Sequence, residues 1–524
     1  MWALFHPPFG AVCQAGEIKD KDDSAMKKTQ VAVGVVVALG VVWTGAAWFT
    51  GKKLESNMDQ MIQNANAQLT AMAPNSRLKV SYQDYQRGIF SSKMNVVIQA
   101  SSQTEDNPLL KPGQSIILNE QIDHGPFPFA QLKKFNLIPS MASVHTTLAN
   151  TDAVKKLFEL TNNQSFINAE TRVGYSGSTD TAVNILPIDY QNAQTAQRAA
   201  TSGGTVNISA DNKGDKVSLD SDIDSIAITS KNQVDQPVMF TLNGLKLKAD
   251  THLTSEGVRI GDQSISVDKL AAAVNGQDAV ILNKMVGDSA FDNKAGKISG
   301  DINYKIDGVE VQKQNLGQFA LKMKLSQFDA QSVKTFSDNY NAQLTTLMNQ
   351  PGVEDDPVRF QNGVRAILLN NLPTLLKGAP TVSVAPLSWK NDKGESTFNL
   401  NVNFNDPSTV TGEPQTLAAS VDRVLKTLDL KLSVNMPMAT ETMRHIGLAE
   451  GYQADDAQKL ADQQVKGLAA MGQMFRLTQT QDNNIVTSLQ YANGQVNMNG
   501  DKMTLEQFMS RYMLGVPTNE GMPE

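Results

Sequence analysis

Residues 240–267 read FTLNGLKLKADTHLTSEGVRIGDQSISV, and the pattern of this stretch predicts the class of the fold. Apolar residues two positions apart alternate with polar ones, at Phe240/Leu242, Leu245/Leu247, Val258/Ile260 and Ile265/Val267. The dipeptides Asn243-Gly244 and Glu256-Gly257 separate these pairs, and such dipeptides favour tight turns. Short runs of period two with turn residues between them predict antiparallel strands that are joined as hairpins.

The same alternation recurs over most of the chain. It is found within 94–98, 206–228, 302–325, 382–434 and 485–498, with further turn signals at Asn212-Lys213-Gly214, Asp307-Gly308 and Asn493-Gly494. The positions between the apolar residues carry Asn, Ser, Thr and lysines such as Lys246, Lys248, Lys322 and Lys324. We therefore expect sheets with one dry face and one wet face.

Four segments have helical character instead. They are Leu54–Ala73, which Pro74 ends, Ala330–Asn349, Val358–Leu376 and Ala454–Met474. In the first of them the apolar residues recur with the 3.6-residue period of an amphipathic helix.

The longest apolar run is Val31–Phe49, VAVGVVVALGVVWTGAAWF, which holds 19 consecutive residues without a charge. A helix of this length spans about 28 Å, close to the ~30 Å hydrocarbon core of a bilayer. Lysine pairs flank both ends, and Trp43 and Trp48 lie toward the C-terminal end, where indoles favour the membrane interface. We predict an uncleaved transmembrane anchor. The alternatives are a signal peptide that is cleaved near Gly45-Ala46-Ala47 and a buried core helix.

The start of the chain bears on the orientation of this anchor. Met26-Lys27-Lys28-Thr29 reads like a natural bacterial N-terminus, whereas residues 1–25 have neither a helical nor a strand period. We interpret residues 1–25 as an over-extended, unstructured N-terminus. An α-amino group at Met26 adds a third positive charge to the flank, so the positive-inside rule places the large C-terminal part in the periplasm.

These patterns predict an α+β, β-rich fold: a single N-terminal transmembrane helix, followed by antiparallel β-meander sheets with interspersed amphipathic helices. The expected divisions are a cytoplasmic flank with the anchor at 26–53, a β-rich periplasmic domain at 54–329, a helical link at 330–378 and a C-terminal α+β domain at 379–524.

The composition excludes several classes of protein. The 524 residues carry a net charge of -7, which argues against binding of nucleic acid, because phosphate neutralisation needs a basic face. The single cysteine, Cys13, cannot form an intrachain disulfide or a cysteine-rich zinc site. A chain without thiols after residue 13 is compatible with an oxidising compartment.

No catalytic or metal-binding motif is found in the sequence. His124, His145, His252 and His445 are not spaced as metal ligands. The triplet Glu354-Asp355-Asp356 is interpreted as the start of a helix, and Asp220, Asp222 and Asp224 as the wet face of a strand. A cation site is the alternative for both acidic groups. We therefore predict no catalytic, cofactor-binding or metal-binding residues and no cofactor.

Two further segments are unusual: Tyr82–Ser92, YQDYQRGIFSS, and His124–Phe129, HGPFPF. The prolines on both sides of Phe127 exclude a central strand, because proline has no N–H to donate to the ladder. We predict a stiff corner between a strand and a helix. Gly88 is expected to allow a close approach or a positive φ, and Phe127 and Phe129 are expected to be buried.

These segments resemble the YdgA/YihF-like family of bacterial envelope proteins of unknown function. The matching pieces are the start at Met26, the single span, Tyr85–Ser92, His124–Pro128 and the run from Tyr491 to Gly500. The resemblance covers essentially Met26 to the C-terminus, and residues 1–25 depart from it. It implies an inner-membrane-anchored periplasmic protein that forms a homodimer and is linked to surface (swarming) motility. It implies no catalytic residues.

The main functional hypothesis is a non-enzymatic envelope protein. Its partners are the lipid bilayer of the inner membrane, a second copy in a homodimer, and envelope proteins or lipid, but not nucleic acid. The alternatives are a cleaved, soluble periplasmic binding protein and a hydrolase with dispersed catalytic residues. A long open apolar groove favours lipid handling, whereas a filled core with a flat polar surface favours a protein partner.

We predict that the protein stays with the inner membrane after a salt or carbonate wash, because 19 uncharged residues bury a full span. Fractionation followed by N-terminal sequencing of the cellular protein checks this. Recovery of a soluble form that begins near Ala47 or Trp48 would contradict it.

Overall fold

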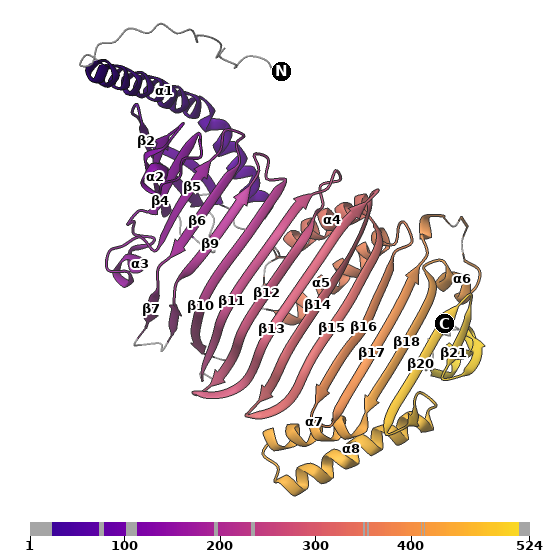
Figure 1. Ribbon diagram of the computed structural model, residues 1–524. Coiled ribbons are helices and arrows are strands. Elements are labelled where there is room, and N and C mark those ends of the chain that lie inside the picture. The colour runs from indigo at the N-terminus through magenta and orange to yellow at the C-terminus, as the bar shows by residue number, and fades with distance from the viewer. Residues whose placement is uncertain are drawn as a thin grey trace.

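The structure is a computed structural model that describes residues 24–72, 78–100, 110, 113–192, 197–231, 236–348, 350, 352–353, 356–409, 411–412 and 414–512. Figure 1 shows one long sheet with helices along its borders. The helices are α1 (Ser24–Met72), α2 (Phe129–Lys133), α3 (Lys155–Leu160), α4 (Ala330–Met348), α5 (Pro357–Leu375), α6 (Leu417–Asp422), α7 (Met436–Ala449), α8 (Ala454–Met474) and α9 (Leu505–Tyr512), with a short 3-10 helix at Pro407–Thr409.

The strands of the described residues form a single antiparallel sheet of 22 strands. They are β1 (Leu78–Arg87), β2 (Ser91–Ala100), β3 (Ser115–His124), β4 (Ala142–Leu148), β5 (Ile167–Val173), β6 (Thr179–Ile185), β7 (Ile188–Gln191), β8 (Arg198–Thr201), β9 (Gly204–Ala210), β10 (Lys216–Lys231), β11 (Pro237–Leu253), β12 (Arg259–Val274), β13 (Gln277–Lys294), β14 (Lys297–Val311), β15 (Gln314–Asp329), β16 (Thr381–Asn391), β17 (Gly394–Phe404), β18 (Leu425–Asn435), β19 (Gln479–Gln481), β20 (Asn484–Ala492), β21 (Gln495–Met498) and β22 (Asp501–Thr504).

The strands pair mostly in chain order. β6 pairs with β9, which continues to β10, and β18 pairs with β20. The short β7 and β8 pair with each other beside β10, and β19 pairs with β20. The predicted β-rich α+β class with antiparallel meanders is therefore confirmed, with one continuous sheet where several were expected.

Two of the predicted turns are wrong. Asn243-Gly244 lies inside β11 and Asp307-Gly308 lies inside β14, so the strands of this region are 15 to 18 residues long. Asn243 is paired on both sides, with Ser225 of β10 and with Lys269 of β12. Gly244 takes a φ of +66°, which is a local irregularity and not a chain reversal. Ladder bonds on both sides of a central strand outweigh the local preference of the dipeptide for a turn.

Other sequence predictions are confirmed. Turns are found at Asn212–Gly214, at Glu256-Gly257 and at Asn493-Gly494. Helices α4, α5 and α8 match their predicted bounds to within one residue at each end. Helix α7 was not predicted, because its apolar residues continue directly from those of β18 without a break.

Helix α1 connects the predicted membrane run to the sheet. It continues without interruption to Met72, so the amphipathic segment at 54–73 extends the same helix. Leu54 and Met58 pack with Ile122 and Ala142, which fixes the second half of α1 against β3 and β4. The side chains of residues 31–42, and all of residues 1–23 with Cys13, lie outside the described residues. Among the helices that the structure describes, none is both long and apolar enough to cross a membrane.

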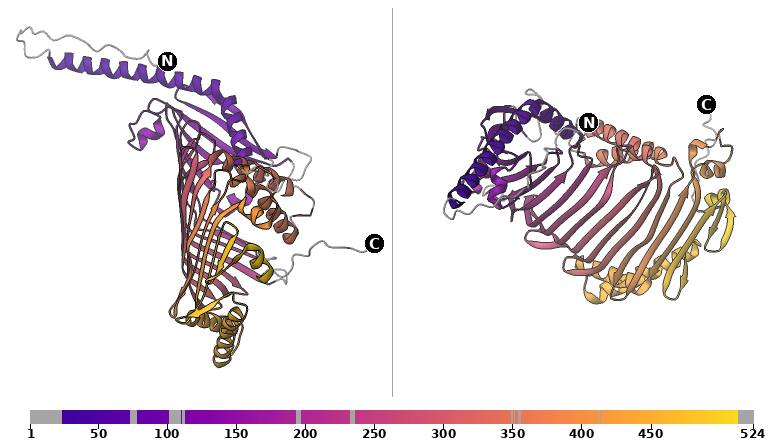
Figure 2. Two further views of the ribbon diagram at one scale, coloured as in Figure 1. Left: turned by 90° about the vertical axis from the view of Figure 1, so that its right-hand side faces the viewer. Right: turned by 45° about the horizontal axis from the view of Figure 1, so that its top comes forward.

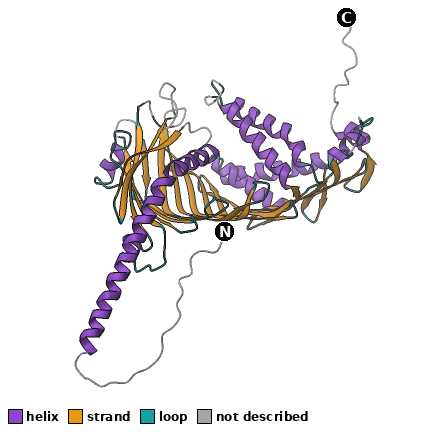
Figure 3. Ribbon diagram, turned by 90° about the horizontal axis from the view of Figure 1, so that it is seen from above, coloured by secondary structure: helices purple, strands orange, loops and turns teal. Residues whose placement is uncertain are grey.

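The helical segment between β15 and β16 is an excursion from the sheet, because the two strands pair directly. Its two helices, α4 and α5, pack on each other through Leu347, Val353 and Ile367. The division into domains at 329 and 378 stays a prediction. Figures 2 and 3 show that α4, α5, α7 and α8 project from the same face of the bent sheet.

Candidate functional site

The middle of the sheet has one apolar face. Residues directly opposite each other in paired strands lie on the same face, so the register sorts the side chains into rows across the strands. One row consists of Val267, Met285, Ile306, Phe319 and Trp389, and the next of Leu247, Ile265, Gly287, Tyr304, Leu321 and Leu387. We call these two rows the apolar floor. The second row crosses six strands and is about 24 Å wide at ~4.8 Å per strand.

An aromatic ring lies flat over the centre of the floor. A β-carbon built on Gly287 lies 2.6 Å from Cε1 of Tyr304 and 3.1 Å from Cγ2 of Ile265. The ring of Tyr304 therefore occupies the space that a side chain at 287 would fill. Even so, Tyr304 and Ile265 remain substantially exposed. The glycine lets the aromatic ring widen the apolar surface without closing it over.

Among the described residues, the main contacts between helices and the sheet lie away from the centre of the floor. α1 contacts β1 and β3, α4 contacts the end of β15, and α7 contacts β15 to β18. Phe291 shares the face of Met285 because it lies six positions further along the strand, and it packs near Val333 in the first turn of α4. Helix α4 therefore stands at one end of the strands on the side of the floor, with α7 at the other end (Figure 2). Between the two helical pairs, Ile265 and Tyr304 are exposed, Val267 is buried and the other apolar side chains of the floor are half-buried.

The opposite face of the sheet is polar. Asp222 pairs with Lys246 at 3.5 Å and Asp220 with Lys248 at 3.6 Å across β10 and β11. Asp220 and Asp222 therefore lie on the predicted wet face, where lysines of the neighbouring strand balance their charges, and Asp224 is exposed on the same strand. No group of three or more His, Cys, Asp or Glu residues that could hold a metal ion is found in the part of the chain that the structure describes.

A second feature is the corner where the two unusual segments meet. His124 is 2 % exposed, and its Nε2 lies 2.8 Å from Oγ of Ser92. Its Nδ1 lies 3.1 Å from the carbonyl oxygen of Ile89, which accepts, so Nδ1 carries the proton and Nε2 accepts from Ser92. The hydroxyl of Tyr85 lies 3.2 Å from the same Ser92 oxygen. Sequence positions 85, 92 and 124 are thus joined in one buried polar chain.

Glycines let the elements of the corner approach closely. A side chain at Gly51 of α1 would collide with the imidazole of His124, and one at Gly125 would collide with the carbonyl of Ser140. A β-carbon at Gly88 would lie 2.9 Å from the carbonyl oxygen of Ser91, so the expected close approach is confirmed there. His124 therefore links β2, β3 and the end of the apolar run of α1 to one another.

The expected burial of the two phenylalanines is wrong. Phe129 is substantially exposed and Phe127 is half-buried. Phe129 does not enter a core because its ring packs edge-on against Trp43 of α1, with the centroids 5.0 Å apart, and against Phe90 at 5.7 Å. The three rings form an aromatic cluster at the surface of the corner.

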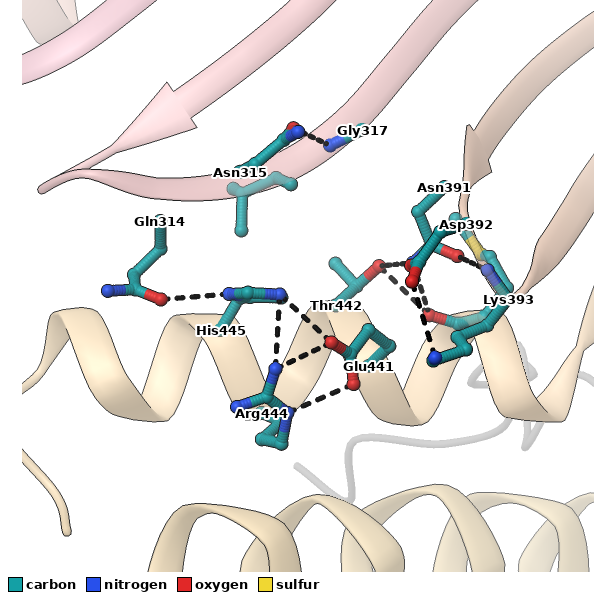
Figure 4. Close-up of polar contacts among 12 residues, drawn as sticks. Gln314, Asn315, Gly317, Asn391, Asp392, Lys393, Glu441, Thr442, Arg444 and His445 are labelled. Carbon is teal, nitrogen blue, oxygen red and sulfur yellow. Dashed lines mark hydrogen bonds and ion pairs between the residues drawn. The ribbon is translucent and has the colours of Figure 1, made fainter. Parts of the chain in front are cut away.

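The structure brings a third group of polar residues together at the end of the floor, under α7 (Figure 4). Glu441 accepts from Arg444 at 2.6 and 2.9 Å, and Nε2 of His445 lies 3.0 Å from the same carboxylate. Nδ1 of His445 lies 2.8 Å from Oε1 of Gln314 on β15. The hydrogen bonds from Arg444 lower the pKa of Glu441. These contacts tie α7 to the sheet. The sequence analysis did not predict this group. The i, i+3, i+4 spacing of Glu441, Arg444 and His445 on one helix is the signal by which it could have been found.

The remaining predicted positions are dispersed. His145 lies 2.8 Å from Glu170, and His252 is exposed on β11. Asp356 caps α5 by accepting from the backbone N–H of Arg359 at 3.0 Å, so its interpretation as a helix start is confirmed. Glu354 and Asp355 lie outside the described residues. The four histidines that were singled out do not come together at one site.

The described residues define a β-rich protein with a large antiparallel sheet. The chain belongs to the family described as bacterial protein of unknown function (DUF945), which matches residues 26–506. It is 45% identical to Protein YdgA of Escherichia coli K12, over 95% of this chain and all of that protein. It is 27% identical to the uncharacterized protein YihF of the same organism, over 92% of this chain and 98% of YihF.

A further similarity is to an uncharacterized protein of Haemophilus influenzae, which is 24% identical over 62% of this chain and 94% of that protein. No solved structure matches the chain. The resemblance to the YdgA/YihF-like family is confirmed by these matches.

The buried His124 predicts a pH dependence of stability. Burial lowers the pKa of its imidazole, and the nearby charge of Arg87 acts in the same direction, against the hydrogen bond to Ile89 and the charge of Asp123. The unfolded chain, with an ordinary histidine pKa of about 6.5, then binds more protons than the folded chain. The contribution of His124 is present above that pH and is lost as the pH falls below it.

We expect His124→Gln to flatten the fall in unfolding free energy between about pH 7.5 and pH 5.5, the interval in which a free histidine titrates. Denaturant titration of the detergent-solubilised protein, followed by tryptophan fluorescence, measures this. His145→Gln is the matched control, because that imidazole is partly exposed beside a carboxylate. Equal pH slopes for the parent and His124→Gln would show that His124 is not a buried neutral base.

Proposed function

We propose that this protein is anchored in the inner membrane by Val31–Phe49 and that its periplasmic sheet binds the acyl chains of lipids on the apolar floor, without chemical turnover. The observation that carries the proposal is the floor itself: two rows of apolar side chains across the middle of the sheet, in which Ile265 and Tyr304 are exposed. The uncharged run and the lysines on both of its sides support the anchor.

The dimensions of the floor suit an acyl chain. The hydrocarbon core of a bilayer is about 30 Å thick, so the chains of one leaflet extend about 15 Å. The second row of the floor, about 24 Å wide, can hold such a chain along its length. Each apolar side chain that a ligand covers contributes about 1.5–3 kcal/mol when its burial is complete. An open, flat site of this kind recognises chain length and apolarity more than a headgroup.

A protein partner is the second candidate, and helix α8 favours it. α8 buries Ala457, Ala461 and Val465 toward α7, whereas Leu468, Met471 and Met474 are exposed on another side of the helix. An exposed stripe at this spacing suits docking of another helix or sheet, including that of a second copy. The homodimer and the link to swarming motility that the family resemblance implies stay predictions.

The lipid proposal predicts opposite results for two matched substitutions. Ile265 lies on the floor and is 40% exposed, and Val286, in the neighbouring strand and on the opposite face, is 46% exposed. Ile265→Asp places a charge where acyl chains would lie, at a desolvation cost of several kcal/mol. We expect it to reduce crosslinking of a photoactivatable acyl-chain phospholipid at least tenfold, with Val286→Asp close to the parent.

The crosslinking is measured on the full chain in bacterial membranes, with the labelled peptides mapped by mass spectrometry. Both variants replace an exposed β-branched aliphatic residue, so a general loss of fold would affect the two alike. Equal labelling of Ile265→Asp and Val286→Asp would contradict lipid binding on the floor.

A further inference from the structure

An apolar loop follows α2 and points into solvent. Phe135 is 92% exposed, and Leu137 and Ile138 are also among the most exposed large apolar residues of the described chain. Two lysines, Lys133 and Lys134, come directly before them and are exposed as well. We call residues 135–138 the apolar loop. Exposure of these apolar side chains to water is unfavourable, and a molecule outside the chain that covered them would remove this cost.

The loop is held in this conformation by the fold. Phe135 has a φ of +56°, a region that bulky residues seldom adopt. The buried Gln131 donates to Ser143 at 3.0 Å and accepts from Nδ2 of Asn136 at 2.9 Å, and Oδ1 of Asn136 accepts from the N–H of Ile138 at 3.1 Å. A polar network rooted in the sheet therefore fixes the apolar side chains outward, instead of letting them fold back onto the protein.

The loop follows a short helix that contacts the predicted membrane run. Helix α2 begins at Phe129, whose ring contacts Trp43 of α1. Trp43 precedes the end of the uncharged run at Phe49 by six residues, which is about 9 Å of helix. The protein body thus touches α1 at a level inside the apolar run. Trp48, just beyond, stacks with Arg87 and Lys52, whose charges lie 5.7 and 5.6 Å from its ring centroid.

We propose that the apolar loop inserts into the bilayer that α1 crosses, at the boundary between headgroups and acyl chains, as a second membrane contact. This inference rests on the anchor in the proposed function. Phe135, Leu137 and Ile138 enter the boundary in the manner of an interfacial amphipathic segment, while Lys133 and Lys134 remain among anionic headgroups. With two contacts the first strands of the sheet are fixed in orientation relative to the membrane, which a single helix would not achieve.

The test uses the full chain in liposomes of phosphatidylethanolamine and phosphatidylglycerol. Cys13→Ser removes the native thiol, and Phe135→Cys provides a site for a polarity-sensitive fluorophore. We expect blue-shifted emission and quenching by lipids with a nitroxide high on the acyl chain. Tyr452→Cys is the control, because this half-exposed aromatic residue lies between α7 and α8, at the other end of the molecule from α1 (Figure 1). Quenching at 135 should exceed that at 452 at least threefold.

Flotation of the same liposomes separates the two proposals. Co-flotation with strong quenching at 135 supports both. Co-flotation with equal, water-like emission at 135 and 452 overturns the loop insertion and leaves the anchor standing. Failure to co-float overturns both. A second protein combines Lys133→Gln and Lys134→Gln with the labelled Phe135→Cys. The double substitution should lower the quenching at 135 in the presence of phosphatidylglycerol, and unchanged quenching would overturn the role of the two lysines.

Discussion

The register between long neighbouring strands is the constraint on which the structure depends. Each central strand from β10 to β17 has ladder partners on both sides, so its alternation of side chains must agree with two neighbours at once. A slip of one residue would move a whole set of apolar side chains to the wet face. The lysines and aspartates that pair across β10 and β11 oppose such a slip, because it would place charges on the apolar floor.

Local sequence signals explain much of this fold but not the extent of its strands. The alternation at 240–267 correctly indicates antiparallel pairing, and the caps and apolar periods place α4, α5 and α8. Asn243-Gly244 nevertheless stays within a strand, because Asn243 pairs with Ser225 and Lys269 in the neighbouring strands. The local sequence does not show these pairings. The same is true of the floor. Period two shows that one face is apolar, but whether helices cover it depends on where α4 and α7 lie after the chain folds.

The corner of α1, β2 and β3 shows a different relation between sequence and structure. The motifs around Arg87 and His124 were recognisable as unusual, and their prolines and glycines indicated a tight turn. Their contact was not predictable, because the hydrogen bond between Ser92 and His124 joins residues 32 positions apart. The burial of Phe129 was wrongly predicted for the same reason. Its partner Trp43 belongs to another element, and the ring of Phe129 packs on α1 instead of in a core.

The floor and the corner face different surroundings. From β1, which α1 contacts, to β11, where the floor begins, the pairing passes through eight interfaces, or about 38 Å along the sheet at ~4.8 Å each. In the proposed arrangement, the bilayer covers the exposed Phe135. The exposed Ile265 and Tyr304 would then bind a lipid that has left the bilayer, because the intervening strands separate them from the proposed anchor. The proposed membrane contact at one end of the sheet and the apolar floor further along it would together allow the protein to hold a lipid outside the membrane.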